Sequence, residues 1–396
     1  MRILLVTPHF YPETFKCNDM AFELQRRGHD VTVMTPIPDY PKGSYFDGYG
    51  IFKRRRETIN GVKIHRSLII PRGNGSSIRL ALNYISYTCF ATLKAIWFGI
   101  SKKYDAIIVH ETSPILVGIP AVIIKKLQNI PLFFWVLDLW PESLTAAGGI
   151  SNKHILSFFK KITNWIYKNS NRILISSKGF RNSINQKGDY QNNIVYFPNW
   201  IDNIHPSVQN IPTFTHGFNV VFTGNIGDAQ DFPHILKAAE LLNGKKINFI
   251  IVGDGRMRPW LEKSIQEKGL TNIILLGRYP VETMPLFYKQ ADILFLALKD
   301  SPIFSLTVPA KLQAYMSSGK PIVAMINGEG AELIREADCG WSVPAEDSES
   351  LANLLYNLSS LDKDELLSKG ENGKKYSTKH YDFTKCMDHL CQIISS

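Results

Sequence analysis

Three glycine-containing segments in the second half of the chain could bind a diphosphate. Each follows an apolar run that predicts a strand, and the first two precede predicted helices. Glycine lets the backbone approach a ligand closely, and a helix N-terminus presents free N–H groups and partial positive charge to an anion. Any one segment could be an ordinary strand-to-helix turn, but three in succession favour an anion site. The predicted residues of this site are Gly224, Asn225, Gly227, Gly253, Gly255, Arg278 and Tyr279.

Two cations accompany these segments. Arg256 lies within the second segment, and Lys311 lies in the first turn of a helix that is predicted to begin near Pro309. A lysine in that turn is electrostatically unfavourable, because the helix N-terminus already carries partial positive charge. A bound anion would remove the conflict, while a solvated lysine is the alternative. The segments contain neither the P-loop pattern nor the third glycine of the dinucleotide fingerprint, so neither ATP nor NAD binding is predicted.

Carboxylates and histidines follow predicted strands in the first half of the chain. Asp138 and Glu142 follow one strand, where they could orient hydroxyl groups or accept a proton. His9 and Glu13 follow the first strand, and His110 follows another. The alternatives are that Asp138 caps a helix, that Glu142 is solvated and that His110 is structural. The 10 histidines and 5 cysteines show no metal-ligand spacing or disulfide framework, so we predict no bound metal and reduced thiols.

The elements that must position these residues form two series of short apolar strands separated by helical patterns. Uniformly apolar strands of this kind predict parallel sheets covered on both faces. A Pro- and Asn-rich stretch at 196–212 separates the series. We therefore predict an α/β chain of two doubly wound domains, 1–205 and 206–379, followed by a last helix at 380–396. Ligands of such folds bind at the carboxyl ends of the strands.

Charge is distributed unevenly along the chain. The formal net charge is +10, but residues 1–205 hold 26 basic and 13 acidic side chains, against 19 and 22 beyond. Aromatic and apolar stretches adjoin basic residues in the first half, as in Tyr84–Phe98 with Lys94 and Lys102. Such a surface suits anionic lipid. Nucleic acid is disfavoured because the glycine loops would then have no role, and the basic run 53–56 could instead be a solvated loop.

The hydropathy pattern bears on location. The longest mainly apolar uncharged stretches are shorter than the ~20 residues that a bilayer span needs. The N-terminus runs directly into strand-like sequence and lacks the pattern of a signal peptide. We therefore expect a cytoplasmic protein, peripheral on the inner face of the membrane.

One segment carries a family resemblance. Residues 300–324, with Pro309-x-Lys311 and Gly319-x-Pro321, resemble the signature region of family-4 retaining GT-B glycosyltransferases. The two glutamates of that signature would fall at Leu306 and Ala314 and are absent. The sequence resembles instead a subgroup that carries Pro-x-Lys, typified by a proposed N-acetyl-fucosaminyl transferase of O-antigen synthesis. Further segments resemble the same subgroup: 40–43, 60–62, 79–87, 138–143 and 198–202.

This resemblance implies a fold and a reaction. The fold is GT-B, in which two Rossmann-like domains face a central cleft and the last helix returns to the first domain. The reaction is retaining, metal-independent transfer of a sugar, such as an N-acetylated deoxyhexosamine, from a nucleotide-diphosphate donor, with a UDP-sugar favoured. The acceptor is a polyprenyl-diphosphate-linked saccharide of bacterial surface polysaccharide (O-antigen or capsule) synthesis. No cofactor is implied.

The resemblance also orders the candidate residues by role. Domain 206–379 would bind the donor through the three glycine segments, and domain 1–205 would lie on the acceptor side. The proposed catalytic residues are Asp138, Glu142, Lys311 and Arg256, the last two neutralising the diphosphate. The further donor-binding residues are Ser305, Leu306, Thr307, Gln313 and Glu329, and the acceptor-side residues are His9, Glu13 and His110. A sugar-nucleotide 2-epimerase and a non-catalytic sugar-nucleotide-binding homologue are the alternatives.

Overall fold

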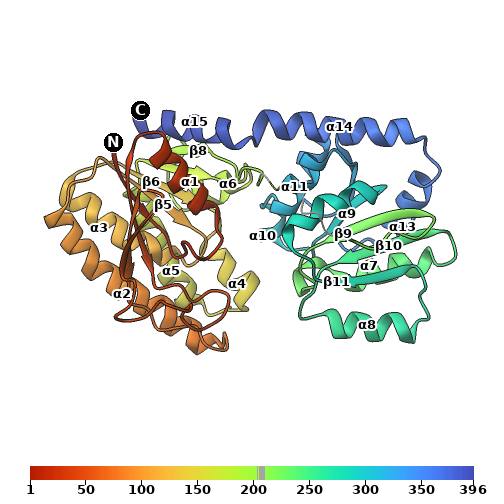
Figure 1. The fold of residues 1–396 in the computed structure, drawn as a ribbon, viewed down its shortest axis with the longest axis horizontal. Helices are drawn as coiled ribbons and strands as arrows, with labels where there is room; N and C mark the ends of the chain where they lie inside the picture. The colour runs from red at the N-terminus through yellow and green to blue at the C-terminus, as the bar shows by residue number, and fades with distance from the viewer. Residues whose placement is uncertain (203, 205–209) are drawn as a thin grey trace. The chain divides into compact units, whose positions relative to one another are not determined.

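The computed structural model describes residues 1–202, 204 and 210–396 of the chain (Figure 1). The chain forms two compact units. The N-terminal unit comprises Met1–Pro198 with Met387–Ser396, and the C-terminal unit comprises Asn199–Cys386. The domain boundary that the sequence predicts at 205/206 lies outside the described residues, and the division into units falls earlier, after Pro198. The final segment that belongs to the N-terminal unit begins at Met387 rather than at residue 380.

The sheet of the N-terminal unit has the strand order β3-β4-β2-β1-β5-β6-β7-β8. All neighbouring strands are parallel except β3 and β4, which form an antiparallel hairpin. The strands are β1 (Arg2–Val6), β2 (Asp30–Pro36), β3 (Arg56–Ile59), β4 (Val62–Ser67), β5 (Ala106–Glu111), β6 (Leu132–Val136), β7 (Arg172–Ile175) and β8 (Ile194–Tyr196). The apolar runs in the sequence did not indicate β3, β4 and β8, because β3 and β4 alternate with polar residues and β8 has only three residues.

Helices pack on this sheet and on one another. Gly99 allows α2 and α3 to approach closely, because a Cβ atom there would meet the side chain of Leu127; the two helices lie side by side in Figure 1. Arg27 at the end of α1 forms an ion pair with Asp388 of the last helix at 2.6 Å. The helices are α1 (Lys16–Arg26), α2 (Ser77–Ser101), η1 (Ile115–Val117), α3 (Gly118–Gln128), α4 (Glu142–Gly148), α5 (Lys153–Lys168), α6 (Phe180–Asn185) and α15 (Phe383–Ser395).

The C-terminal unit has a fully parallel sheet in the order β11-β10-β9-β12-β13-β14. This order reverses direction between the first strand, β9, and the fourth, β12. Doubly wound folds bind their ligands at such a switch point, outside the carboxyl ends of the strands. The strands are β9 (Phe218–Thr223), β10 (Ile247–Val252), β11 (Ile273–Gly277), β12 (Ile293–Ala297), β13 (Ile322–Met325) and β14 (Gly340–Val343). The sequence prediction missed only β14, which is a half-exposed edge strand.

The helices of the C-terminal unit cover both faces of this sheet. They are η2 (Asp228–Gln230), α7 (Phe232–Leu241), α8 (Arg258–Glu267), η3 (Val281–Thr283), α9 (Met284–Gln290), α10 (Pro302–Ser305), α11 (Ala310–Ser318), α12 (Glu329–Glu336), α13 (Ser348–Leu358) and α14 (Lys363–His380). In the part of the chain that the structure describes, no helix is long and apolar enough to cross a membrane.

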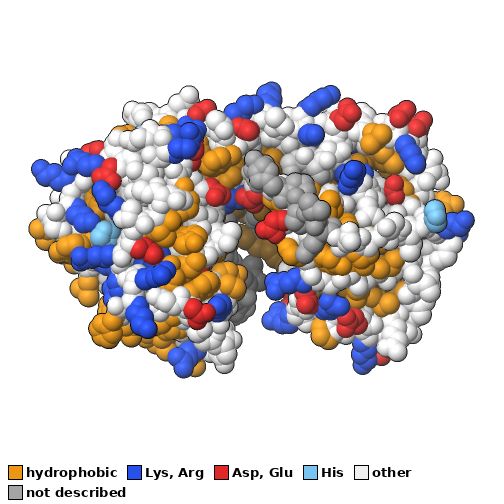
Figure 2. All heavy atoms as spheres, in the orientation of Figure 1, with side chains coloured by type: hydrophobic (Ala, Val, Ile, Leu, Met, Phe, Trp, Pro, Cys, Tyr) orange, Lys and Arg blue, Asp and Glu red, His pale blue; other side chains and the backbone are white. Residues whose placement is uncertain are grey.

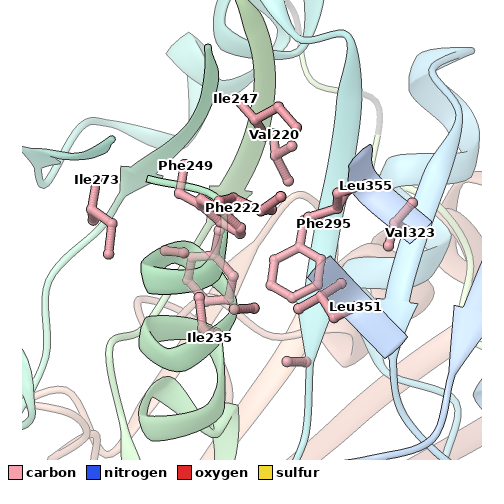
Figure 3. Packing of buried hydrophobic residues seen from close by; sticks show 14 of the residues in the cluster. Val220, Phe222, Ile235, Ile247, Phe249, Ile273, Phe295, Val323, Leu351 and Leu355 are labelled. Carbon is pink, nitrogen blue, oxygen red and sulfur yellow. The ribbon is translucent and has the colours of Figure 1, made fainter. Parts of the chain in front are cut away.

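Two apolar cores lie on opposite faces of this sheet. Phe222 of β9 belongs to the core beneath α7 and α13, whereas its neighbour Val221 belongs to the core on the other face. Figure 3 shows Phe222 and Phe295 on the same side of the sheet as Ile235 of α7. Successive strand residues point to opposite faces, so a strand buried on both sides needs apolar residues throughout. Burial of both faces explains the uniformly apolar runs in the sequence. Packing on both faces also fixes the positions of the carboxyl ends of the strands.

Candidate active site

The first two glycine segments meet at the carboxyl ends of β9 and β10. The Gly224 N–H donates to the Val252 carbonyl oxygen at 2.8 Å, and the Ile226 N–H donates to the Asp254 carbonyl oxygen at 2.9 Å. The backbones are so close that a Cβ atom on Gly253 would overlap the carbonyl oxygen of Gly224. The loops therefore form one backbone surface, and glycine is required for it.

The Asn225 side chain lies within this surface. A Cβ atom on Gly255 would lie 2.6 Å from Asn225 Oδ1, and one on Gly227 would overlap the amide nitrogen of the same residue. The missing side chains of the two glycines thus leave the space that the Asn225 amide fills. The sequence-predicted residues of the two loops are brought together.

Lys311 stands beside the loops at the switch point of the sheet. Its Nζ atom lies 3.7 Å from the centroid of the Phe222 ring, and a Cβ atom on Gly224 would lie 3.0 Å from it. Burial lowers the pKa of the Lys311 amine to about 7. Among the described residues, no hydrogen-bond or ion-pair partner faces this amine. Lys311 is therefore a buried cation, and a bound anionic ligand would supply its counter-charge.

Tyr315 and Tyr288 join the elements around Lys311 to the end of β9, and the sequence did not indicate either residue. Tyr315 lies one turn after Lys311 on α11, and its hydroxyl oxygen accepts a 2.9 Å hydrogen bond from the Thr223 N–H. Tyr288 Oη lies 3.4 Å from Thr223 Oγ1. These contacts tie α11 and α9 to the end of β9. The helix ends as predicted, at Gly319 in the left-handed conformation.

The remaining cations of the loops are exposed. Arg256 is 82% exposed and forms an ion pair with Asp228, so its charge is shared and screened. Arg278 is exposed, and the neighbouring Tyr279 ring packs edge-on against Phe287 at 4.8 Å. Lys311 is therefore the better placed of the two predicted diphosphate-binding cations.

The segment before α11 contains a short helix and is not simply a polar loop. Ser305 ends the short helix α10, with Leu306 and Thr307 directly after it. The Thr307 hydroxyl donates to the Ile303 carbonyl oxygen at 2.8 Å. A Cβ atom on Gly328 would overlap the carbonyl oxygen of Ser305. This segment packs closely against the N-terminus of α12.

Gln313 and Glu329 differ in their surroundings. The Gln313 side chain is buried, and its Nε2 donates to the Asn199 carbonyl oxygen at 3.1 Å. The sequence predicts that Gln313 contacts a donor hydroxyl; the structure instead uses this amide group to fix the backbone at the start of the C-terminal unit. Glu329 is the first residue of α12 and is half-buried.

Asp138 in the N-terminal unit lies beside a buried second carboxyl group. Its backbone N–H donates to Glu111 Oε2 at 3.3 Å, and Glu111 is fully buried at the end of β5. Burial raises the pKa of Asp138 to about 6, and burial together with Asp138 raises the pKa of Glu111 well above its usual range. Glu111 is thus neutral when Asp138 ionises, and Asp138 can act as a base near neutral pH.

Glu142 does not join this pair of carboxyl groups. Its Oε1 atom forms a 2.6 Å ion pair with the buried amine of Lys187 and accepts a 3.0 Å hydrogen bond from the Ser183 hydroxyl. Glu142 and Lys187 line a cavity of about 230 Å³. The sequence suggests that Glu142 orients acceptor hydroxyl groups or accepts a proton, or else is solvated; in the structure its charge balances a buried lysine.

His9 and Glu13 form one unit after β1. Glu13 Oε2 lies 2.8 Å from His9 Nδ1, while Glu13 Oε1 accepts the backbone N–H groups of Asp39 and Tyr40 at 2.9 and 2.8 Å. The His9 ring stacks on Phe15 at 4.5 Å. Glu13 thus fastens the loop after β2 to the loop after β1, which is a structural task rather than direct contact with an acceptor.

The acceptor-side role that the sequence predicts for His110 is also corrected. The side chain is 1% exposed, contacts Thr7 Oγ1 through Nδ1 at 3.2 Å and packs against the edge of the Trp135 ring. Burial lowers its pKa to about 3, so it stays neutral. His110 is a core histidine, because its strand is covered on both faces.

Comparison with protein families decides what this geometry belongs to. The family model described as "Glycosyl transferases group 1" matches residues 217–360, which include all three glycine segments and Lys311. The model described as "Glycosyl transferase 4-like domain" matches residues 16–200. Together the two models cover most of both units. The chain is a group 1 glycosyltransferase.

Curated relatives of this glycosyltransferase carry the same activity in their names. It is 27% identical to the probable glycosyltransferase WbjE of Pseudomonas aeruginosa over 245 residues, which are 58% of this chain and 61% of WbjE. The match thus spans less than two thirds of that relative. It is 22% identical over 341 residues to WcaI of Escherichia coli (strain K12), whose name links it to colanic acid biosynthesis, with 81% of this chain and 82% of WcaI covered.

Solved structures place the glycosyltransferase in the GT-B fold. Anabaena Alr3699/HepE, solved in complex with UDP, superposes with a TM-score of 0.72 at 13% identity, and the match covers 100% of both chains. At this identity the likeness concerns the fold. The two doubly wound units of the glycosyltransferase are the two Rossmann-like domains that the sequence predicts.

Proposed function

We propose that this glycosyltransferase moves a sugar from a nucleotide-diphosphate donor to a lipid-linked saccharide, with retention of configuration and without a metal ion. The donor is a UDP-sugar, and its sugar is an N-acetylated deoxyhexosamine. The acceptor is a polyprenyl-diphosphate-linked saccharide in bacterial surface polysaccharide synthesis. The enzyme works on the cytoplasmic face of the membrane as a peripheral protein.

The position of Lys311 carries this proposal. The amine lies at the switch point of the C-terminal sheet, beside Gly224, with no carboxylate partner among the residues that the structure describes. A buried amine with a pKa near 7 gains most from a ligand that brings negative charge. A diphosphate is such a ligand. The complex of HepE with UDP supports the choice of a uridine diphosphate.

The chemistry follows from charge that develops on the leaving group. When the bond between the sugar and the diphosphate breaks, negative charge grows on the diphosphate oxygens. Lys311, the N–H groups at the start of α11 and the backbone surface of the glycine loops stabilise that charge. These groups are fixed before the reaction, so they need no reorganisation during it. Arg256 adds a weaker, exposed charge.

Asp138 is proposed to orient the acceptor. Its carboxylate is poised to ionise near neutral pH, and the neutral Glu111 beside it prevents repulsion between two negative charges. A carboxylate in that state accepts hydrogen bonds from sugar hydroxyl groups and can take up a proton. The polysaccharide pathway in the name of WcaI supports a saccharide acceptor.

The proposal is tested by incubating the purified protein with UDP-, GDP- and dTDP-sugars in the presence and absence of bacterial membranes. Nucleotide release that depends on membranes, together with a labelled lipid product, supports the transferase. Interconversion of free sugar nucleotides would favour the epimerase, and tight UDP binding without turnover would favour a binding protein. The Lys311→Ala variant serves as the control for donor-dependent release.

A further inference from the structure

A cationic cavity lies in the N-terminal unit, and Asp138 is not among the residues that line it. Its volume is about 470 Å³, and it is bounded by the β3–β4 hairpin and one side of α2. The lining residues are Arg55, Arg56, His65, Arg66, Phe90, Leu93, Lys94 and Trp97. Four of these side chains are arginine or lysine, and none is acidic.

The cations of this cavity are held close together by the backbone. Arg55 Nε donates to the Arg66 carbonyl oxygen at 2.9 Å, and the Lys94 amine donates to the same oxygen. Arg56 faces His65 across the hairpin and lies over the Trp97 ring. Sharing one carbonyl oxygen places the two charges of Arg55 and Lys94 side by side. Such an arrangement is unfavourable without an anion.

One cation of this cavity has a carboxylate partner. Arg66 is fully buried and forms an ion pair with Glu57. Among the described residues, Arg55, Arg56 and Lys94 have no carboxylate partner. Burial lowers the pKa of Lys94 to about 7, and the nearby arginines contribute to that shift. A multiply charged anion would relieve the repulsion.

The solvent face of α2 beside the cavity is apolar. Large hydrophobic residues are exposed along the length of this helix: Ile78, Leu82, Ile85, Phe90, Leu93, Ile96, Trp97 and Ile100. Leu93 and Trp97 belong both to this stripe and to the cavity wall. Figure 2 shows hydrophobic side chains gathered over the region of α2, with lysine and arginine side chains around them. Helices that lie in a membrane interface combine these two features.

We propose that the cavity binds the phosphate headgroup of an anionic phospholipid while the apolar stripe of α2 lies in the membrane interface. Arg55, Arg56 and Lys94 contact the phosphate oxygens, and Trp97 and Leu93 contact the glycerol and the first acyl carbons. This inference rests on the peripheral attachment in the proposed function, and it assigns that attachment to one lipid-binding pocket rather than to diffuse charge.

The test measures binding of the full chain to vesicles by co-sedimentation. Vesicles of phosphatidylcholine with phosphatidylglycerol are compared with pure phosphatidylcholine, and inorganic phosphate at the same total concentration is the free-anion arm. Arg56→Glu should weaken binding to the anionic vesicles about tenfold. Lys53→Glu makes the same charge change in an exposed residue of the same basic run outside the cavity, and should weaken binding by about threefold or less. Ile100→Gln tests the apolar stripe and should also weaken binding about tenfold.

Several outcomes overturn the inference. Equal losses in Arg56→Glu and Lys53→Glu would mean diffuse electrostatic attraction, and full competition by inorganic phosphate would mean a free-anion site. A dimer without vesicles that Ile100→Gln dissociates would mean that a second copy covers α2. UDP binding and thermal unfolding of each variant report the donor site and the fold separately. Intact UDP binding with lost vesicle binding in Arg56→Glu therefore supports the pocket independently of the transfer reaction.

Discussion

The Lys311 Nζ atom lies 3.7 Å from the centroid of the Phe222 ring, so the last apolar core residue of β9 contacts the charged group of α11. A protonated amine gains from the face of an aromatic ring, but it gains far more from an anion. The Phe222 ring belongs to the apolar core under α7 and α13, and the Lys311 amine lies between this ring and Gly224 of the first glycine loop.

Lys311→Met is expected to lower donor-dependent nucleotide release by at least about a hundredfold, because it removes a charge that stabilises the leaving diphosphate. The same variant should unfold at a higher temperature at pH 6, where the native protein must hold a charged, buried amine. Lys289→Met, at an exposed position on α9, is the control. Full activity in Lys311→Met would refute the role of the amine.

UDP binding is expected to take up about one proton at pH 8. The free Lys311 amine has a pKa of about 7 and is mostly neutral at this pH, and a bound diphosphate raises that pKa. Affinity should therefore fall as the pH rises above 7. Calorimetric titration in two buffers with different ionisation enthalpies measures the uptake. The same proton uptake in Lys311→Met would assign it to another group.

Asp138→Asn is expected to lower transfer about a hundredfold and to stabilise the protein at pH 8 by roughly 1–3 kcal/mol. The pKa of Asp138 is raised to about 6 from its ordinary 3.8, so the penalty for its charge is fully present above pH 6 and absent below 3.8. Thermal unfolding of the variant and the parent should therefore converge near pH 4. A stabilisation that is independent of pH would contradict the assignment.

Gly253→Ala is expected to destabilise the C-terminal unit by about 3 kcal/mol or more and to abolish UDP binding. The new Cβ atom would overlap the Gly224 carbonyl oxygen, and the φ of +155° is unfavourable for alanine. Gly244→Ala also has a positive φ but meets no atom within 4 Å, so it reports the conformational penalty alone. If both variants bind UDP equally well, the loop contact is unimportant.

Glu142→Gln is expected to destabilise the protein by roughly 1–3 kcal/mol, because it leaves the buried Lys187 amine without its counter-charge. Ser183→Ala removes a hydrogen bond to the same carboxylate but keeps the ion pair, and should have a smaller effect. Adding Lys187→Met to Glu142→Gln should restore most of the stability. A stable but inactive Glu142→Gln would restore the catalytic role that the sequence suggested.

The sequence was sufficient for features that depend on neighbouring residues. Gly224 and Gly253 follow apolar runs, and Lys311 follows the helix start at Pro309, so their places at strand ends and in a first helical turn are local properties. The strand order, with β9 beside β12, is not local. The contact of Tyr315 with Thr223 depends on that order, which is why the sequence did not indicate that Tyr315 positions Lys311.

The errors share a physical cause. His110, Glu142 and Gln313 have side chains that could act chemically, and each follows a strand or lies near a glycine turn. In the structure these side chains are buried or have partners far away in the sequence. Glu142 forms an ion pair with Lys187, 45 residues away, and Gln313 donates a hydrogen bond to the backbone of Asn199, 114 residues away. Glu111 was missed for the opposite reason. Its type and place in the sequence do not mark it, and its effect on Asp138 depends on its burial beside that residue.

The division of the chain into units has a consequence for how such enzymes diversify. The N-terminal unit is assembled from two segments, and the C-terminal unit, Asn199–Cys386, is inserted between them. Exchange of the whole C-terminal unit, the donor-binding unit in the function proposed above, therefore needs two crossovers, near residues 198 and 387, rather than fusion at one point. A chimera with a single crossover would give the N-terminal unit a last helix from another parent, in which Asp388 opposite Arg27 could be missing.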